Sequence, residues 1–118
     1  MIASIAQHTT QFGRPVLLLN GDSHVYRSDN PLQQGAACTG DVESGQSICT
    51  SDVHNVLVGS TREAWNSHPS YDVSNFHRIV VHGSTIPLEY LRLTIDPKAH
   101  YASTATTFGI FSWSRVTE

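Results

Sequence analysis

The sequence has few charges, no excess of basic residues and no long apolar run. Charged residues make up 14% of the 118 residues and the net charge is −3 at pH 7, whereas an average soluble domain has roughly 25% charged residues. This balance gives no signature of nucleic-acid binding. No stretch approaches the roughly 20 apolar residues that span a bilayer, so we expect no membrane segment. Hydrophobic residues still reach 39%, which is enough for a modest core.

Cysteine is also scarce, with only Cys38 and Cys49 in the chain. The two residues enclose a segment rich in glycine, serine and aspartate, and the sequence leaves open whether they form a disulfide or stay as free thiols. The first eight residues lack the basic and apolar regions of a signal peptide. The many serine and threonine residues favour an oxidising compartment. We therefore expect an extracytoplasmic or secreted protein whose export signal lies upstream of Met1.

Hydrophobic periodicity predicts one N-terminal helix and about four to five strands, in a β-rich α/β fold. The helix is expected over residues 2–12 and ends at Gly13. The strands are expected at residues 16–19, 24–29, 76–81, 91–96 and 108–116. Between them we expect a long irregular insertion around residues 33–74. The sequence thus predicts a single or partial domain over residues 1–118.

Candidate chemistry follows directly after the apolar run Val16–Leu19. Asn20 and Gly21 end this run, and Asp22 and His24 follow two positions apart. In extended backbone these two side chains project to the same side, and a carboxylate with a neutral imidazole suits a divalent transition metal. A turn capped by the carboxylate, beside a histidine at the end of a strand, explains the same pattern without a metal.

Three stretches resemble the C-terminal region of calcineurin-like metallophosphoesterases, and together they cover about half of the chain. They are Arg14–Leu32, Asn75–Gly83 and Leu91–Pro97. The resemblance implies that the chain is the C-terminal part of a two-sheet sandwich. It also implies that two divalent metals (Mn, Fe or Zn) lie between the sheets of the complete protein, and that the reaction is hydrolysis of a phosphate ester.

The last metal-binding motif of that family is Gly-His-x-His, which matches Gly21-Asp22-Ser23-His24 in this chain. His24 takes the place of a metal ligand. Asp22 stands where the family has histidine, and we assign it as a second ligand. We assign Asn20 to contact with the substrate. The resemblance leaves open the catalytic residues, the metal, the particular phosphate ester and the oligomeric state.

The earlier motifs of the family find no match in the 20 residues before Gly21. These motifs are Asp-x-His, Gly-Asp and Gly-Asn-His-Asp/Glu. Because a metal ion takes about four ligands, one loop does not supply a complete centre. We therefore expect this chain to be the C-terminal part of a larger phosphoesterase, or a truncated relative, and to be inactive alone.

Two other functions stay open. In a serine esterase of the Gly-Asp-Ser-Leu type, Ser23 would be the nucleophile. Against this, the segment Asp52-Val53-His54 is one residue shorter than the Asp-x-x-His of those esterases, and the chain has no Gly-x-Asn-Asp. The other alternative is a non-catalytic β-rich interaction module, in which Gly21–His24 is only a turn after a strand.

The remaining histidines show no metal-ligand spacing, and we expect most of them at the surface. They are His8, His54, His68, His77, His82 and His100. We expect the two tryptophans, Trp65 and Trp113, to pack in the core rather than to bind substrate.

Overall fold

The computed structural model describes residues 2–21, 25–33, 36–43, 46–47, 72–83 and 88–117. Within these ranges the chain forms one helix and nine strands. The elements are α1 (Ile2–Phe12), β1 (Val16–Asn20), β2 (Arg27–Asp29), β3 (Thr39–Gly40), β4 (Val42–Glu43), β5 (Gln46–Ser47), β6 (Phe76–Val80), β7 (Glu89–Ile95), β8 (Thr107–Phe108) and β9 (Phe111–Thr117). The predicted β-rich α/β class is confirmed. The strands outnumber the expected four to five because β3, β4, β5 and β8 have only two residues each, which is too short for a detectable period.

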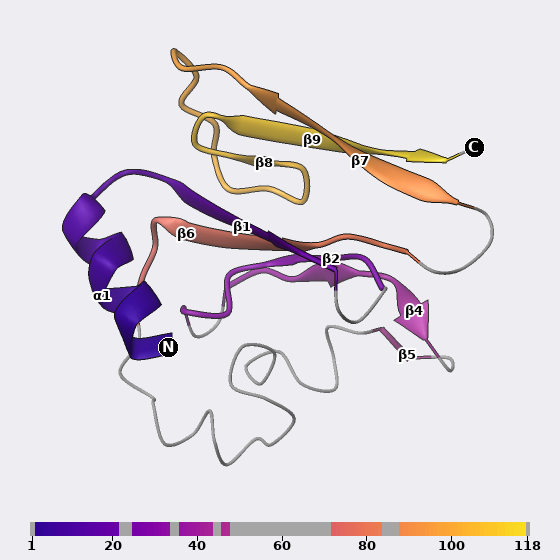
Figure 1. Ribbon diagram of the computed structural model, residues 1–118, viewed down its shortest axis with the longest axis horizontal. Coiled ribbons are helices and arrows are strands. Elements are labelled where there is room, and N and C mark those ends of the chain that lie inside the picture. Colours follow the sequence, from indigo (N-terminus) through magenta and orange to yellow (C-terminus); the bar gives the residue numbers. More distant parts are fainter. Residues whose placement is uncertain are drawn as a thin grey trace.

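The main strands form two stacked sheets, as Figure 1 shows. One sheet has the order β1-β6-β2-β3 and the other has the order β7-β9-β8, while β4 and β5 pair separately. Strands β1 and β6 are parallel, and β2 runs antiparallel to β6. Helix α1 covers the four-stranded sheet on the face opposite the three-stranded sheet, at the end where β1 begins (Figure 1).

Apolar side chains pack on both faces of the four-stranded sheet. On the face toward α1, the core consists of Ala6, Leu32, Val73 and Phe76, with Ile5, Val16 and Leu18 packed against it. On the face toward the three-stranded sheet, the core consists of Tyr26, Ile79, Phe108 and Trp113, with Leu17, Leu91, Leu93 and Phe111 packed against it. Because both faces of β1 are covered, its sequence is a continuous apolar run rather than an alternating one.

Helix α1 ends as the sequence predicts, at a glycine in the left-handed region. Gly13 has a φ of 70°, and its N–H donates to the Thr9 carbonyl at 3.2 Å. The Asn75 side chain then ties this end of the helix to the start of β6. Its Nδ2 donates to the carbonyls of Thr9 and Arg14, both at 2.8 Å.

The C-terminal segment differs from the single strand expected over residues 108–116. Gly109 has a φ of 59° and divides this segment into the hairpin of β8 and β9. The aromatic and β-branched residues on either side hide the turn in the sequence. Strand β7 is confirmed, and its alternating exposure matches the predicted half-buried strand.

Part of the expected irregular insertion around residues 33–74 contains the short strands β3, β4 and β5, so it is less irregular than predicted. Residues 48–71 lie outside the described ranges. Cys38 is disulfide-bonded, and the other cysteine of the chain, Cys49, falls in those residues. Among the described residues, no helix has the length and apolar character needed to cross a membrane.

Candidate functional site

The candidate site lies where β1 and β6 end. The register places Asn20 beside Val80, and the Val81 N–H donates to the Asn20 carbonyl at 2.7 Å. The carboxyl ends of β1 and β6 therefore lie next to each other, on the side of the sheet that we call the carboxyl edge. Open α/β sheets bind ligands at this position. The predicted residues Asp22, Ser23 and His24 come directly after this point and lie outside the described ranges.

Asn20 is the predicted site residue that the structure describes. It is half-buried at the last position of β1. Its Oδ1 atom is shielded from solvent and has no hydrogen-bond partner within the described ranges. A buried amide oxygen without a partner is uncommon and costs roughly 1–3 kcal/mol. Such an atom marks a position for a hydrogen-bond donor or a cation at this edge of the sheet.

His82 is a candidate that the sequence analysis missed. It follows β6 by two residues, at the same edge as Asn20, and it is half-buried rather than at the surface. The signal available in the sequence was its position after an apolar strand, which it shares with His24. Within the described ranges, no group of three or more His, Cys, Asp or Glu side chains could hold a metal ion. A complete metal centre would need further ligands.

His77 lies in the core, which corrects the expectation for this histidine. It is 3% exposed, because the alternation of β6 turns it with Ile79 toward the three-stranded sheet. The Nε2 atom is 2.8 Å from Ser28 Oγ, and the ring stacks on Phe108 with centroids 5.3 Å apart. Burial, and then the positive charge of Arg78, lower the pKa of His77 from 6.5 to about 4. His77 is therefore a neutral structural residue.

We expect His77 to make the fold sensitive to acid. The pKa of His77 is about 4 in the folded chain and 6.5 in the unfolded chain. Between pH 4 and pH 6.5 the unfolded chain therefore binds more protons than the folded chain. Stability therefore falls as the pH falls through this window. The free energy of unfolding should lose about 2 kcal/mol between pH 7 and pH 5 from this group, given about 1.4 kcal/mol per pKa unit. Urea unfolding at several pH values measures the slope.

The His77→Gln variant supplies the comparison, because glutamine does not titrate. We expect a shallower loss of stability in this variant between pH 7 and pH 5, whereas His100→Gln, at an exposed histidine, should follow the wild type. An identical slope for wild type and His77→Gln would contradict the assignment.

A buried ion pair lies on the same sheet face as Asn20. Asp29 accepts from Arg78 Nε at 2.9 Å and from Arg78 Nη2 at 2.5 Å, and Arg27 Nε lies 3.6 Å from Asp29 Oδ2. All three side chains are at most 5% exposed. Strand pairing aligns Asn20 with Val80 and Val80 with Arg27, so Arg27 is two strands away from Asn20, about 10 Å. Two guanidinium groups and one carboxylate thus lie close together in the interior on this face of the sheet.

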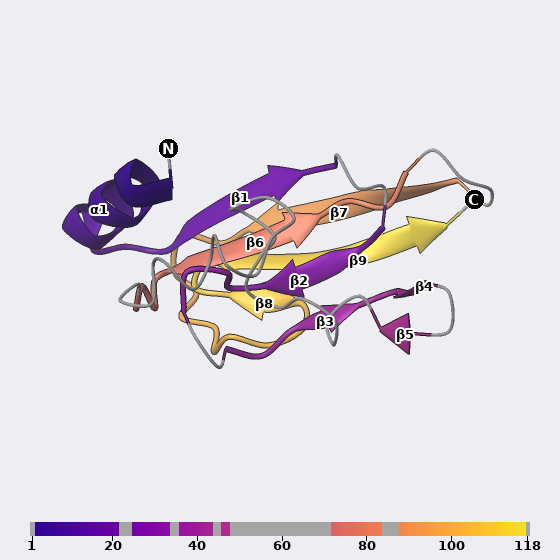
Figure 2. The same ribbon diagram turned by 90° about the horizontal axis from the view of Figure 1, so that it is seen from below.

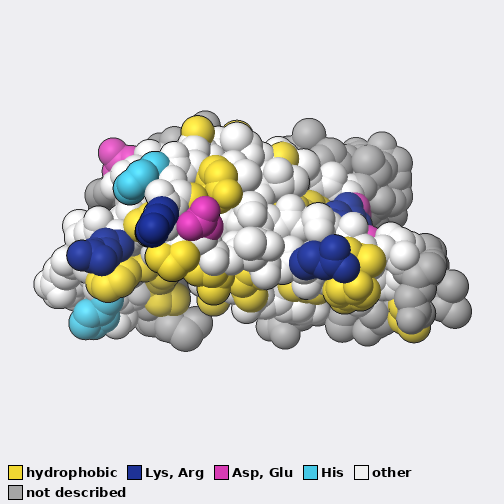
Figure 3. Space-filling model, turned by 90° about the horizontal axis from the view of Figure 1, so that it is seen from above, with side chains coloured by type: hydrophobic (Ala, Val, Ile, Leu, Met, Phe, Trp, Pro, Cys, Tyr) yellow, Lys and Arg dark blue, Asp and Glu magenta, His cyan; other side chains and the backbone are white. Residues whose placement is uncertain are grey.

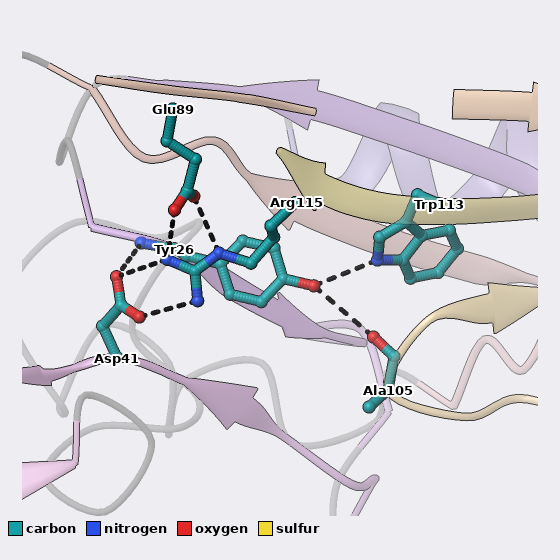
Figure 4. Close-up of polar contacts among 6 residues, drawn as sticks. All are labelled: Tyr26, Asp41, Glu89, Ala105, Trp113 and Arg115. Carbon is teal, nitrogen blue, oxygen red and sulfur yellow. Dashed lines mark hydrogen bonds and ion pairs between the residues drawn. The ribbon is translucent and has the colours of Figure 1, made fainter. Parts of the chain in front are cut away.

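A second network holds the two sheets together and thereby fixes the sheet that carries Asn20 (Figure 4). Arg115 donates to Glu89 at 2.7 and 3.0 Å and to Asp41 at 2.9 and 3.3 Å. Its guanidinium carbon lies 4.2 Å above the ring of Tyr26, whose hydroxyl accepts from Trp113 Nε1 at 3.0 Å. Burial acts to lower the pKa of Arg115, but the bonds to Glu89 and Asp41 together raise it.

This network confirms Trp113 as a packing residue, since it is 5% exposed and its indole N–H is bonded within the core. Trp65 lies outside the described ranges.

No protein-family profile, no curated protein and no solved structure matches the chain.

Proposed function

We propose that this chain carries part of a two-metal site that hydrolyses phosphate esters. Asp22 and His24 are the proposed metal ligands, and Asn20 is the proposed substrate contact. The observation that carries the proposal is the buried Asn20 Oδ1 at the carboxyl edge of the sheet, which has no hydrogen-bond partner among the described residues. The segment with the phosphoesterase-like Gly-Asp-Ser-His sequence begins at the next residue.

When bound, two divalent metals polarise a phosphate group and lower the pKa of a water nucleophile. The residues of this chain have simpler tasks. Asp22 and His24 offer an oxygen and a nitrogen ligand. Asn20 can accept a hydrogen bond at Oδ1 and donate one from Nδ2 to a phosphate oxygen. The half-buried His82 is a further possible ligand at the same edge. We propose that the other ligands of the two metals come from residues other than Asp22, His24 and His82.

The disulfide bond at Cys38 supports an extracytoplasmic place of action. Disulfides persist in oxidising compartments and are rare in reducing ones. We therefore keep the extracytoplasmic location as part of the proposal.

Calorimetric titration with Mn²⁺ and Zn²⁺ tests the proposed metal ligands. We expect the chain to bind these ions and His24→Ala to bind them more than about tenfold more weakly, because even the loss of a group that only supports a ligand costs 10–100-fold. Asp22→Asn should weaken binding as well. The matched control is His100→Ala, an exposed histidine, which should bind as the wild type does. Equal affinity for wild type and His24→Ala would refute the metal site.

The serine esterase alternative makes the opposite prediction. In that case Ser23 reacts with a fluorophosphonate probe, and Ser23→Ala abolishes labelling while metal addition has no effect. We expect no labelling of Ser23, and we expect Ser23→Ala to bind metal as the wild type does.

A further inference from the structure

Asn20 is followed by a glycine, and this pair of residues is chemically labile. Asparagine is one of the thermolabile residues of proteins, because the backbone nitrogen of the next residue can attack its side-chain amide. Glycine lacks a Cβ and leaves this approach open. Of the five asparagines in the chain, Asn20 alone precedes a glycine. The inference below requires only Asn20, Gly21 and water, so it does not rest on the proposed function.

The other two asparagines within the described ranges are held by hydrogen bonds. Asn30 donates from Nδ2 to the Val73 carbonyl at 2.7 Å, and its Oδ1 accepts from the Leu32 N–H at 3.0 Å. Asn75 donates from Nδ2 to two backbone carbonyls, both at 2.8 Å. Asn30 also precedes Pro31, which has no backbone N–H. Neither side chain is therefore placed to react.

The Asn20 side chain lacks such a restraint on its oxygen. The Oδ1 atom has no hydrogen-bond partner among the described residues, so no bond to this atom has to break before the side chain turns toward Gly21. Gly21 follows the last residue of β1 and is exposed, so water reaches the peptide group between the two residues. Asn20 thus combines a reactive neighbour with a weakly held side chain.

One backbone hydrogen bond opposes the reaction. The Val81 N–H donates to the Asn20 carbonyl at 2.7 Å, where β1 and β6 end side by side (Figure 2). The Gly21 nitrogen reaches the Asn20 side chain only after the peptide group between them rotates, and this rotation breaks the bond from Val81. A hydrogen bond contributes only about 0.5–1.5 kcal/mol, and the ends of elements open far more often than the whole fold. The end of β1 therefore reaches the reactive geometry without unfolding of the sheet.

We propose that Asn20 is a deamidation site, at which the neutral amide at the carboxyl edge is replaced by a carboxylate. The Gly21 nitrogen attacks Cγ of Asn20 and forms a C–N bond, while the proton of this nitrogen passes through water to Nδ2. The bond between Cγ and Nδ2 breaks, and ammonia leaves. A water molecule then opens the resulting succinimide ring at either carbonyl carbon and gives aspartate or isoaspartate.

Both products change the carboxyl edge. Aspartate places a negative charge where the amide oxygen of Asn20 is shielded from solvent, which is unfavourable without a partner. Isoaspartate lengthens the main chain by one carbon at the end of β1 and so disturbs the bond from Val81. Either product makes the net charge of −3 more negative by one unit. Figure 3 shows a few charged side chains dispersed among hydrophobic and uncharged ones on one face of the molecule, so one added charge is a large change for this chain.

Incubation of the intact folded chain in a mildly alkaline buffer with EDTA tests the proposal, since EDTA keeps metal ions out of the result. Peptide mapping by mass spectrometry should find Asn20 converted, whereas Asn30 and Asn75 should stay unchanged in the same digest. Ion exchange should separate the modified chain as a more acidic fraction. In that fraction the Val81 amide should exchange its hydrogen faster than before, while Ile79, inside β6 (Phe76–Val80), should exchange at the same rate.

Gly21→Ala is the matched variant. Among the described residues, the atom nearest to a Cβ at Gly21 would be the Val81 carbonyl oxygen, at 3.8 Å, so the variant should keep the fold. The added methyl group obstructs the attack, and we expect conversion of Asn20 to slow about tenfold, equivalent to about 1.4 kcal/mol in the activation free energy. Equal rates in wild type and Gly21→Ala would overturn the proposal. So would equal conversion of Asn20 and Asn75, or conversion of Asn20 only when the chain is unfolded in urea.

Discussion

Replacing Asp29 by alanine is expected to destabilise the fold by about 3–5 kcal/mol, the cost of breaking a buried ion pair from one side. The Asp29 side chain is 1% exposed and Arg78 is fully buried. Without the carboxylate, a guanidinium group is left in the core with two of its hydrogen bonds lost. The total free energy of unfolding of a small domain is only about 5–15 kcal/mol. The loss of the ion pair would therefore remove a large part of the stability. Urea unfolding followed by circular dichroism measures it.

The variant Asp29→Asn keeps the prediction testable if Asp29→Ala does not fold. Asparagine has nearly the same shape as aspartate and can still accept one hydrogen bond from Arg78. Asp29→Asn should therefore lower the free energy of unfolding less than Asp29→Ala does. Asp72→Ala is the matched control, because Asp72 is exposed and, within the described part of the chain, its side chain makes a surface hydrogen bond to Gln33. It should change the free energy of unfolding by no more than about 0.5 kcal/mol. Equal losses for Asp29→Ala and Asp72→Ala would contradict the buried pair.

Replacing Gly109 by alanine is the second large effect, and we expect a loss of about 3 kcal/mol. The φ of 59° at Gly109 costs roughly 1–2 kcal/mol for a residue with a Cβ. A Cβ at this position would also lie 2.6 Å from Pro15 Cβ and nearer still to Pro15 Cγ, and overpacking of this kind costs a further 1–3 kcal/mol. The change would push the β8–β9 turn away from the start of β1. Thermal unfolding of the variant measures the loss.

Gly13→Ala separates the two contributions. Gly13 has a similar φ of 70°, but a Cβ there would meet no atom within 4 Å. Its replacement should cost only the backbone strain, about 1 kcal/mol. A Gly109→Ala variant no less stable than Gly13→Ala would show that Pro15 does not pack against the turn.

The sequence predicts the elements whose patterns are strong and local. Helix α1 ends at Gly13, because glycine readily adopts the positive φ that the residue after a helix often needs. Apolar and polar residues alternate in β7, because one face of this strand is exposed. The hairpin at Gly109 escaped prediction because its strands are apolar on both sides of the turn. The short strands β3, β4 and β5 escaped it because two residues carry no period.

Buried polar residues were the least predictable part. Arg78 and His77 lie in a strand that the sequence predicts, but single-sequence patterns place arginine and histidine at the surface. Their burial depends on Asp29 and Ser28, which come from 49 residues away along the chain. For the site, the end of the apolar run predicted the position of Asn20 at the edge of the sheet. The burial of Asn20 Oδ1 follows from neighbours that only the fold brings together.

The most direct measurement of the proposed metal site is paramagnetic broadening of NMR signals by Mn²⁺. At substoichiometric Mn²⁺, the side-chain amide of Asn20 and the backbone amides of Gly21 and Val81 should lose intensity first, because they lie where the proposed ligands Asp22 and His24 begin. The amide of Gly13, at the opposite end of β1, should stay sharp. In His24→Ala the selective loss should disappear. Uniform broadening, or the same selective loss in His24→Ala, would contradict a metal site at this edge of the sheet.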